Sequence, residues 1–252
     1  MQRGGAATGA GAAQHFRKEY RTLRCARFCS AVVQSMLIPA ISTEPAACVA
    51  VPNSHVVKLA AELLQIVSTA APSVLAPHEL AAVADLLLRP THAHHPYTRW
   101  ACEQRAHVMW LVRVGAALCA EKRRRWPANA PHCYEAIYAE LARRLPADMR
   151  ALPTALDETQ LPAVCASETS VPDAAQRRVI GAAVAAGRRS RAFRLYYVFT
   201  KLTKPHIAQF GGAAETQARR VAKRQQRPIS FTVPEPWASF TLTEHERGLM
   251  SH

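Results

Sequence analysis

The stretch NSHVVKLAAELLQIVST, residues 53–69, decides the fold class of this chain. Its apolar residues recur three and four positions apart, which is the spacing of one face of an amphipathic α-helix. The helix is expected to begin after Pro52, where Asn53 or Ser54 is a natural N-cap. The stretch therefore predicts a helix with one face in the core of the protein.

Helical periodicity extends over most of the chain. Alanine-rich stretches that are poor in valine favour helix over sheet, and the sequence has no glycine-rich nucleotide-binding loop. Further helices are expected over about 77–89, 100–125, 132–144 and 174–203. We predict an all-α fold, a compact multi-helix orthogonal bundle with a basic N-terminal arm and a C-terminal tail.

The composition along the chain predicts three segments. Residues 1–35 are expected to be a basic, partly disordered extension, 36–210 the helical core domain, and 211–252 a basic, proline-containing tail. Between Phe16 and Phe28 the extension has the pattern of a basic amphipathic helix. This helix is interpreted as a nucleic-acid-binding arm or a plain appended helix, with an organelle presequence as a third alternative.

The chain is strongly basic, with 32 Lys and Arg against 18 Asp and Glu and a formal net charge of +14. Residues 177–227 hold thirteen of these cations and a single acid, so most of the surplus lies in one segment. A segment of this kind attracts polyanions. We therefore predict a nucleic-acid partner, with DNA favoured. The alternative is arginine-rich codon usage in a GC-rich genome.

Aromatic residues alternate with the cations in this segment, a pairing that suits phosphate contact together with base stacking. The alternative is that the aromatics face the core while the arginines form a solvated face. The candidate nucleic-acid-binding residues are Arg188, Arg189, Arg191, Arg194, Tyr197, Lys201 and Lys204.

Several classes of protein are disfavoured. The seven cysteines are odd in number and scattered, which is typical of reduced thiols and not of a disulfide framework. No apolar run reaches the length of a membrane span, and no secretory signal is visible. We expect an intracellular protein of the host cytoplasm or nucleus, or a virion component, with no membrane partner. The oligomeric state stays open.

One face of the helix over 53–69 carries polar residues that are suited to chemistry. His55, Lys58 and Glu62 lie at positions i, i+3 and i+7, so all three project from one side. An imidazole, an amine and a carboxylate together can transfer protons or bind a phosphate and a sugar. The alternative is a solvent-facing ion pair between Lys58 and Glu62.

A histidine cluster between Pro90 and Pro96 is the second candidate region, with His92 and His95 and, further on, Glu103. Zinc binding by the cluster is an alternative, but the paired spacing of a structural zinc site is absent. A hydrogen-bonding scaffold is the favoured interpretation. We predict neither a metal nor another cofactor.

Three groups of residues occur in a fixed order. The first is SHVVK at 54–58 with Glu62, Gln65 and Ser68–Thr69. The second is Thr91–His92 and His95–Pro96, followed by Trp100, Glu103, Trp110–Leu111 and Leu118–Cys119. The third is AFRLYY at 192–197 with Lys201. In this order they resemble the signature of a small, uncharacterised family found in phages and large DNA viruses. The resemblance covers about residues 36–203.

The chain departs from that signature at several positions. Asn53 and Ser54 stand where the family has Asp-Lys, His94 stands where it has Asn, and His107 replaces another asparagine. An acid and a base are thus missing from the first motif. The departures indicate a diverged copy, either active or inactive.

A weaker resemblance links the first motif to the pyrimidine-dimer DNA glycosylases of phages. His55 and Glu62 have the separation that this family shows between a histidine and its catalytic glutamate. The resemblance implies that Glu62 steadies a sugar-linked intermediate and that His55 supports it. The family's nucleophile is the α-amine at its N-terminus, which corresponds to Met36. Here a lysine such as Lys58 could form the imine, provided that its pKa is depressed.

Two hypotheses follow. In the first, the protein is a viral DNA glycosylase/lyase-like enzyme for damaged or modified bases, with a cleft built from His55, Lys58, Glu62, His92, His95 and Glu103. In the second, it is a non-catalytic nucleic-acid-binding or virion-associated protein whose motif residues only stabilise the fold. Whether the protein is an enzyme stays open. Motifs that share one site would favour the first hypothesis, and separate buried hydrogen bonds the second.

Overall fold

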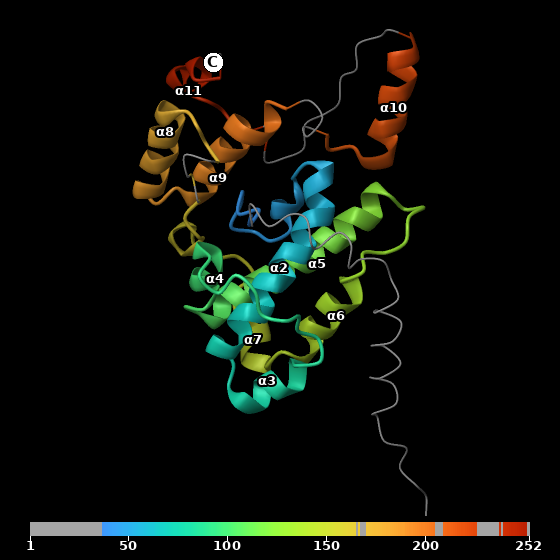
Figure 1. The fold of residues 1–252 in the computed structure, drawn as a ribbon, viewed down its shortest axis with the longest axis vertical. Helices are drawn as coiled ribbons and strands as arrows, with labels where there is room; N and C mark the ends of the chain where they lie inside the picture. Colours follow the sequence, from blue (N-terminus) through green and yellow to red (C-terminus); the bar gives the residue numbers. More distant parts are fainter. Residues whose placement is uncertain are drawn as a thin grey trace, which may run out of the picture. The chain divides into compact units, whose positions relative to one another are not determined.

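Helices α2 (Asn53–Val74) and α5 (Arg105–Arg125) are the two longest and form the centre of the fold (Figure 1). They pack along each other more extensively than any other pair of described elements. The buried face of α2 follows the spacing of three and four predicted from the sequence, with Val56, Leu59 and Leu63 fully buried. Helix α2 is buried beyond this stripe as well, since the polar residues His55, Glu62 and Ser68 are also buried.

A tyrosine joins these two helices to α6 (Glu135–Arg144). The Tyr138 side chain is fully buried, and its hydroxyl donates to the Ala60 carbonyl on α2 at 2.7 Å. Its ring lies against Gly115 of α5 so closely that a Cβ atom at position 115 would overlap it. Only glycine at position 115 leaves room for this ring, because any other residue carries a Cβ atom.

The computed structural model describes residues 37–164, 166, 170–204, 209–225, 237 and 239–250, which belong to the compact unit Leu37–His252. The predicted arm over residues 1–35 lies outside the described residues. The elements not yet named are η2 (Ala47–Val49), α3 (Pro77–Val83), α4 (Pro96–Ala101), α7 (Ala147–Ala151), η3 (Glu158–Gln160), α8 (Ala174–Ala185), α9 (Arg189–Tyr197), the π-helical turn η4 (Val198–Leu202), α10 (Gly212–Gln225) and α11 (Glu244–Gly248). Over the described ranges there are ten α-helices and no strand, so the predicted all-α fold is confirmed.

Two long helices expected from the sequence are divided in the structure. The stretch 100–125 contains the end of α4 and all of α5, which are separated at Gln104, a residue with extended backbone. The break lets the Trp100 ring stack on His107 with a centroid distance of 4.2 Å. Trp100 and Trp110 therefore belong to different helices, although both are buried as predicted.

The second division lies between α8 and α9, at Gly187. This residue has a φ of 72°, a left-handed conformation that glycine adopts readily at the end of a helix. Helix α9 continues directly into the η4 turn. None of the helices in the described part of the chain is long and apolar enough to cross a membrane.

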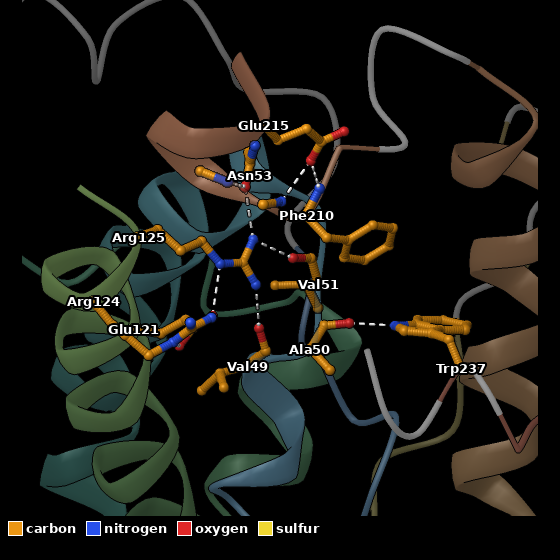
Figure 2. A network of polar contacts seen from close by, with 12 residues as sticks. Val49, Ala50, Val51, Asn53, Glu121, Arg124, Arg125, Phe210, Glu215 and Trp237 are labelled. Carbon is orange, nitrogen blue, oxygen red and sulfur yellow. Dashed lines mark hydrogen bonds and ion pairs between the residues drawn. The ribbon is translucent and has the colours of Figure 1, made fainter. Parts of the chain in front are cut away.

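A buried arginine fixes the start of α2 (Figure 2). Arg125, at the end of α5, has a side chain that is 2% exposed and pairs with Glu121 at 2.6 Å. Its guanidinium also donates to the Val51 carbonyl at 2.9 Å, the Val49 carbonyl at 3.1 Å and Asn53 Oδ1 at 2.9 Å. The Arg125 side chain thereby connects the end of α5 to the segment that precedes α2.

The same region holds residues from the C-terminal part of the chain. The Gly212 amide donates to Asn53 Oδ1 at 3.2 Å, and Glu215 on α10 accepts hydrogen bonds from the Phe210 and Gly211 amides (Figure 2). The Trp237 indole nitrogen donates to the Ala50 carbonyl. Residues assigned to a tail from the sequence therefore contact the entry to α2.

Candidate functional site

Glu62 is a buried carboxylate on α2. It is 8% exposed, its Oε1 lies 2.9 Å from Lys58 Nζ, and its Oε2 accepts a hydrogen bond from the Leu37 amide at 3.2 Å. Burial raises the pKa of Glu62, while Lys58, the Leu37 amide and His92 oppose that rise. This carboxyl group consequently holds a proton more readily than an exposed glutamate does.

His55 lies two turns before Glu62 on the same helix. Its ring meets the ring of Tyr197 edge-on, with a centroid distance of 5.4 Å. Burial, followed by the charges of Lys201 and Lys58, lowers the pKa of His55 to about 4, so the imidazole is neutral at neutral pH. Its Nδ1 is buried and has no hydrogen-bond partner among the described residues.

The end of α9 and the η4 turn bring a second set of polar groups to this place. Tyr197 is fully buried, and its hydroxyl also lacks a hydrogen-bond partner in the described part of the chain. Burial raises the pKa of Tyr197 well above its ordinary value, and the charge of Glu62 adds to the rise. The phenol therefore stays protonated and can donate a hydrogen bond.

Lys201 lies in the η4 turn, four residues after Tyr197. Its amine lies 5.8 Å from the centroid of the Tyr196 ring. Burial lowers the pKa of Lys201, and the charges of Lys204 and Lys58 lower it further, whereas Glu62 acts in the opposite direction. π-Helical turns are rare and are found frequently at functional sites.

The loop before α4 carries His92, which acts electrostatically on the same carboxylate. His92 is exposed, has a φ of 57° and is the one described non-glycine residue with a positive φ. Its charge acts on Glu62 and on His95. Such a conformation is costly for a side chain other than glycine and is found at ligand-binding and active sites.

Two hydroxyl groups on α2 hold this loop in place. Ser68 Oγ accepts a hydrogen bond from the Leu88 amide at 2.9 Å, and Thr69 Oγ1 accepts one from the Thr91 amide at 3.0 Å. Thr69 Oγ1 also lies 2.8 Å from the Thr91 carbonyl oxygen. The residue that follows Thr91 is His92, so the Ser-Thr pair of the first motif positions the histidine of the second.

His95 has a structural role at the start of α4. Its Nδ1 accepts a hydrogen bond from the Tyr97 amide at 3.2 Å and thereby caps the helix. Burial, together with the charge of His92, lowers the pKa of His95. The hydrogen bond from the Tyr97 amide therefore agrees with the favoured interpretation of the histidine cluster as a hydrogen-bonding scaffold.

We call the residues that these contacts and charges bring together the Glu62 cluster: His55, Lys58, Glu62, His92, Tyr197 and Lys201. Four of them were predicted as catalytic from the sequence. Tyr197 and Lys201 were predicted as nucleic-acid contacts instead. Their place in the third motif, in order after the first two, was the signal that could have assigned them to the cluster.

Among the described residues, Glu103 has no contact with the Glu62 cluster. It is exposed in the linker between α4 and α5, and its charge acts on His107. In the described part of the chain, no contact therefore supports the inclusion of Glu103 in the predicted cleft.

The predicted nucleic-acid face is largely occupied by contacts within the protein. Arg191 pairs with both carboxylate oxygens of Glu246 at 2.9 and 2.6 Å, and Arg194 donates to the Ile41 carbonyl at 2.8 Å. Arg189 donates to the Leu161 carbonyl. Arg188 and Lys204 are exposed.

The aromatic residues of this segment face the core. Phe193 and Tyr197 are fully buried and Tyr196 is 3% exposed. None of the three has an exposed ring face on which a base could stack. The core-facing alternative therefore agrees with the structure, because α9 packs its aromatic side inward against the rest of the unit.

The chemistry available in the Glu62 cluster is proton transfer and nucleophilic attack by an amine. In the described part of the chain no group of three or more His, Cys, Asp or Glu is arranged to hold a metal ion. No protein-family model, curated protein or solved structure matches this chain.

Proposed function

We propose that this protein is an enzyme that acts on DNA, of the glycosylase/lyase type, with the Glu62 cluster as its catalytic centre. One observation carries the proposal: three distant segments converge on one buried carboxylate, and two buried polar atoms beside it, His55 Nδ1 and Tyr197 Oη, lack partners in the described part of the chain. Such atoms are rare in folded proteins and call for a functional explanation. A substrate that hydrogen-bonds to both would supply one, and because both atoms are buried, its binding requires the side chains that cover them to move aside.

The properties of Glu62 suit a reaction at a sugar carbon. Because burial raises its pKa, the carboxyl group can donate a proton to a departing group and take one up at the next step. The neutral imidazole of His55 can accept a hydrogen bond through Nδ1, and the Tyr197 hydroxyl can donate one. The three groups together can orient a sugar hydroxyl or ring oxygen next to the acid.

The charge of the chain supports a polyanionic substrate. The formal net charge is +14, and Lys58 in the cluster keeps 34% of its side chain exposed. Arg188 and Lys204, the exposed members of the predicted basic face, lie on either side of α9 and η4 in the sequence. Lysines and arginines that contact phosphates position DNA independently of its base sequence.

The test is a cleavage assay on three duplexes, one intact, one ultraviolet-irradiated and one with a single abasic site. We expect the full chain to nick the damaged duplexes and leave the intact one uncut. Glu62→Gln should reduce the rate about 10²- to 10⁴-fold, the usual range for a lost general acid or base. Glu140→Gln, a change of the same kind in a salt bridge on α6, is the matched control and should leave the rate unchanged.

Binding measured in parallel separates the alternatives. Retained, salt-sensitive DNA binding by Glu62→Gln would show that the loss lies in chemistry. Binding by the unmodified chain without cleavage of either damaged duplex would contradict the proposal and favour the non-catalytic DNA-binding alternative. Equal cleavage by the unmodified chain and Glu62→Gln would remove Glu62 from the mechanism.

A further inference from the structure

Residues 239–250, which include α11, lie against α8 and α9 (Figure 1). Arg191 on α9 donates through Nη2 to both carboxylate oxygens of Glu246, at 2.9 and 2.6 Å, and through Nη1 to the Thr241 carbonyl at 3.3 Å. Gln176 on α8 donates to the Leu249 carbonyl at 2.8 Å. These hydrogen bonds hold the segment on the two helices.

Glu246 presents a fixed negative charge to Arg191. It is 5% exposed, and its Oε2 also accepts a hydrogen bond from the Thr243 amide at 2.7 Å. Burial acts to raise the pKa of Glu246, but the hydrogen bonds from the Thr243 amide and from Arg191 outweigh it and lower that pKa, so the group is a carboxylate at neutral pH. Two anionic oxygens therefore meet the guanidinium, as two oxygens of a phosphate would.

Phe240 places an aromatic ring over two guanidinium groups of α9. The ring centroid lies 5.1 Å from Arg191 Cζ and 5.7 Å from Arg194 Cζ, which are distances typical of a cation–π contact. The arginines of α9 thus meet a carboxylate and a flat ring from the same segment. A nucleotide offers the same two kinds of group, a phosphate that pairs with arginine and a base that stacks on it.

Trp237 covers the aromatic side of the Glu62 cluster. It is 6% exposed, its indole nitrogen donates to the Ala50 carbonyl, and its ring lies 5.7 Å from the Tyr197 ring, measured between centroids (Figure 2). Tyr197 in turn meets the ring of His55. Trp237 is therefore one of the side chains that a substrate has to move aside to reach the Tyr197 hydroxyl. We call residues 237 and 239–250 the C-terminal cover.

Building on the DNA partner of the proposed function, we infer that Arg188, Arg191 and Arg194 bind the phosphate backbone of DNA and that the C-terminal cover occupies this face in the free protein and competes with DNA for it. The three arginines follow one another at steps of three along the start of α9, so they are neighbours on one side of the helix. Arg188 is exposed and is the first of them that DNA can contact.

The competition weakens DNA binding by a measurable factor. Only molecules whose arginines are released from the cover can bind DNA through them, so the apparent Kd equals the intrinsic Kd divided by the released fraction. Any substitution that loosens the cover without touching the arginines should therefore tighten the binding of DNA.

The first experiment measures the affinity of the full chain for a short fluorescent duplex with one abasic site, by anisotropy at fixed salt. Glu246→Gln removes the charge that holds Arg191, and we expect it to tighten binding about 5- to 30-fold. Glu244→Gln is the matched control, because it changes the net charge equally at an exposed position of the same helix. It should change the affinity by less than about twofold, the effect of one remote charge.

A second pair of variants tests whether the released arginine contacts DNA. In the Glu246→Gln background, Arg191→Gln should abolish the gain in affinity. Arg143→Gln in the same background removes an equal charge from α6, where Arg143 is 67% exposed, and should retain the gain. Loss of the gain in both double variants would reduce the effect to net charge and overturn the role of Arg191.

Hydrogen exchange of the unmodified chain measures the displacement itself. We expect the backbone amides of residues 239–250 to exchange faster when the abasic duplex is bound, while those of α6 exchange at the same rate. Unchanged or slower exchange of 239–250 in the complex would overturn the competition. This measurement also decides if Glu246→Gln fails to fold.

The outcomes separate this inference from the proposed function. Glu62-dependent cleavage of damaged DNA, together with equal affinities of Glu246→Gln and Glu244→Gln, would overturn the competition and leave the proposed function standing. Tighter binding by Glu246→Gln without cleavage of any damaged duplex would support the competition and overturn the proposed function. No binding of DNA by any of these proteins would overturn both.

Discussion

His92 combines backbone strain with a place in the proposed catalytic centre. Its φ of 57° is unfavourable for a residue with a Cβ atom. Thr69 Oγ1 accepts from the amide of Thr91, the residue before His92, and donates to the Thr91 carbonyl, and these two hydrogen bonds hold the loop in this conformation. Strained residues of this kind cluster at active and ligand-binding sites, which supports the place of His92 in the proposed catalytic centre.

The substitution His92→Gly should therefore stabilise the protein while it impairs the reaction. Glycine adopts a positive φ without steric cost, so we expect the free energy of unfolding to rise by about 1 kcal/mol. Cleavage of abasic DNA should fall, because the imidazole of His92 is lost from the Glu62 cluster. Urea denaturation and the cleavage assay measure the two effects.

His94→Gly is the matched control in the same loop. His94 is exposed and its φ is not positive, so glycine there should lower the free energy of unfolding by about 0.5–1 kcal/mol. A destabilised His92→Gly protein would show that the backbone at this position is not strained.

Single residues also mark the limit of what the sequence predicts about the site. His55, Lys58 and Glu62 could be grouped from their spacing alone, because one helix places them. His92 required a motif resemblance, since no local pattern says which turn of α2 a loop will meet. Tyr197 and Lys201 were assigned to a surface, because a basic and aromatic sequence does not reveal which of its faces is buried.

Within helix α5, two neighbouring arginines of the run Arg123–Arg125 differ in how far their side chains are exposed, because they lie on different faces of the helix. Arg124 is 70% exposed and Arg125 is 2% exposed, although both pair with Glu121. Arg125 also donates to the carbonyls of Val49 and Val51, which precede α2 and lie 76 and 74 residues earlier in the chain. Its removal leaves those buried oxygens without a donor.

Arg125→Met and Arg124→Met form a matched pair of substitutions. Loss of the buried arginine should lower the free energy of unfolding by about 3–5 kcal/mol, whereas loss of the exposed one should lower it by less than about 1 kcal/mol. Guanidinium denaturation of both variants measures the difference. Equal effects would show that the hydrogen bonds of Arg125 to the entry of α2 contribute little.

The elements themselves were only partly predictable. The beginning of α2, the end of α5 and most of α6 follow from periodicity and from Pro52 and the arginine run. The break between α4 and α5 at Gln104 does not, because neither glycine nor proline marks it and the Trp100–His107 stack that accompanies it is a tertiary contact. Gly187 is a stop signal between α8 and α9 that the single helix expected over 174–203 does not take into account.

For the whole molecule, buried histidines should make the fold sensitive to acid. Burial lowers the pKa of His55, His95, His107 and His132 in the folded state. His132 shows the reason, since its Nε2 donates to the Val57 carbonyl at 3.0 Å and its Nδ1 accepts from the Tyr134 amide at 3.2 Å. A second ring proton would remove the latter bond.

We therefore expect the free energy of unfolding to decrease as the pH falls from about 6.5, the ordinary histidine pKa, towards 4. The unfolded chain binds these protons before the folded one does, so acid favours unfolding. Glu62 acts in the opposite direction, because its raised pKa lets the folded state take up a proton first. Urea titrations at pH 7.5 and 5.0 measure the slope.

Two histidine substitutions test whether the pH dependence of the free energy of unfolding comes from buried histidines or from the net charge of the protein. His132→Gln should flatten the dependence on pH, whereas His94→Gln, at an exposed histidine, should leave it unchanged. Stability that is independent of pH between 7.5 and 5.0 would contradict the expected role of the buried imidazoles.

The contact between Gly115 and Tyr138 restricts which residues can occupy these two positions in related sequences. Because the tyrosine ring occupies the space of a Cβ atom at position 115, a lineage cannot replace Gly115 by a larger residue and keep the Tyr138 ring in place. The loss of the ring would also leave the Ala60 carbonyl without its donor. Among distant relatives, the two positions should therefore covary: glycine should accompany tyrosine, and a larger residue on α5 should accompany a smaller one on α6.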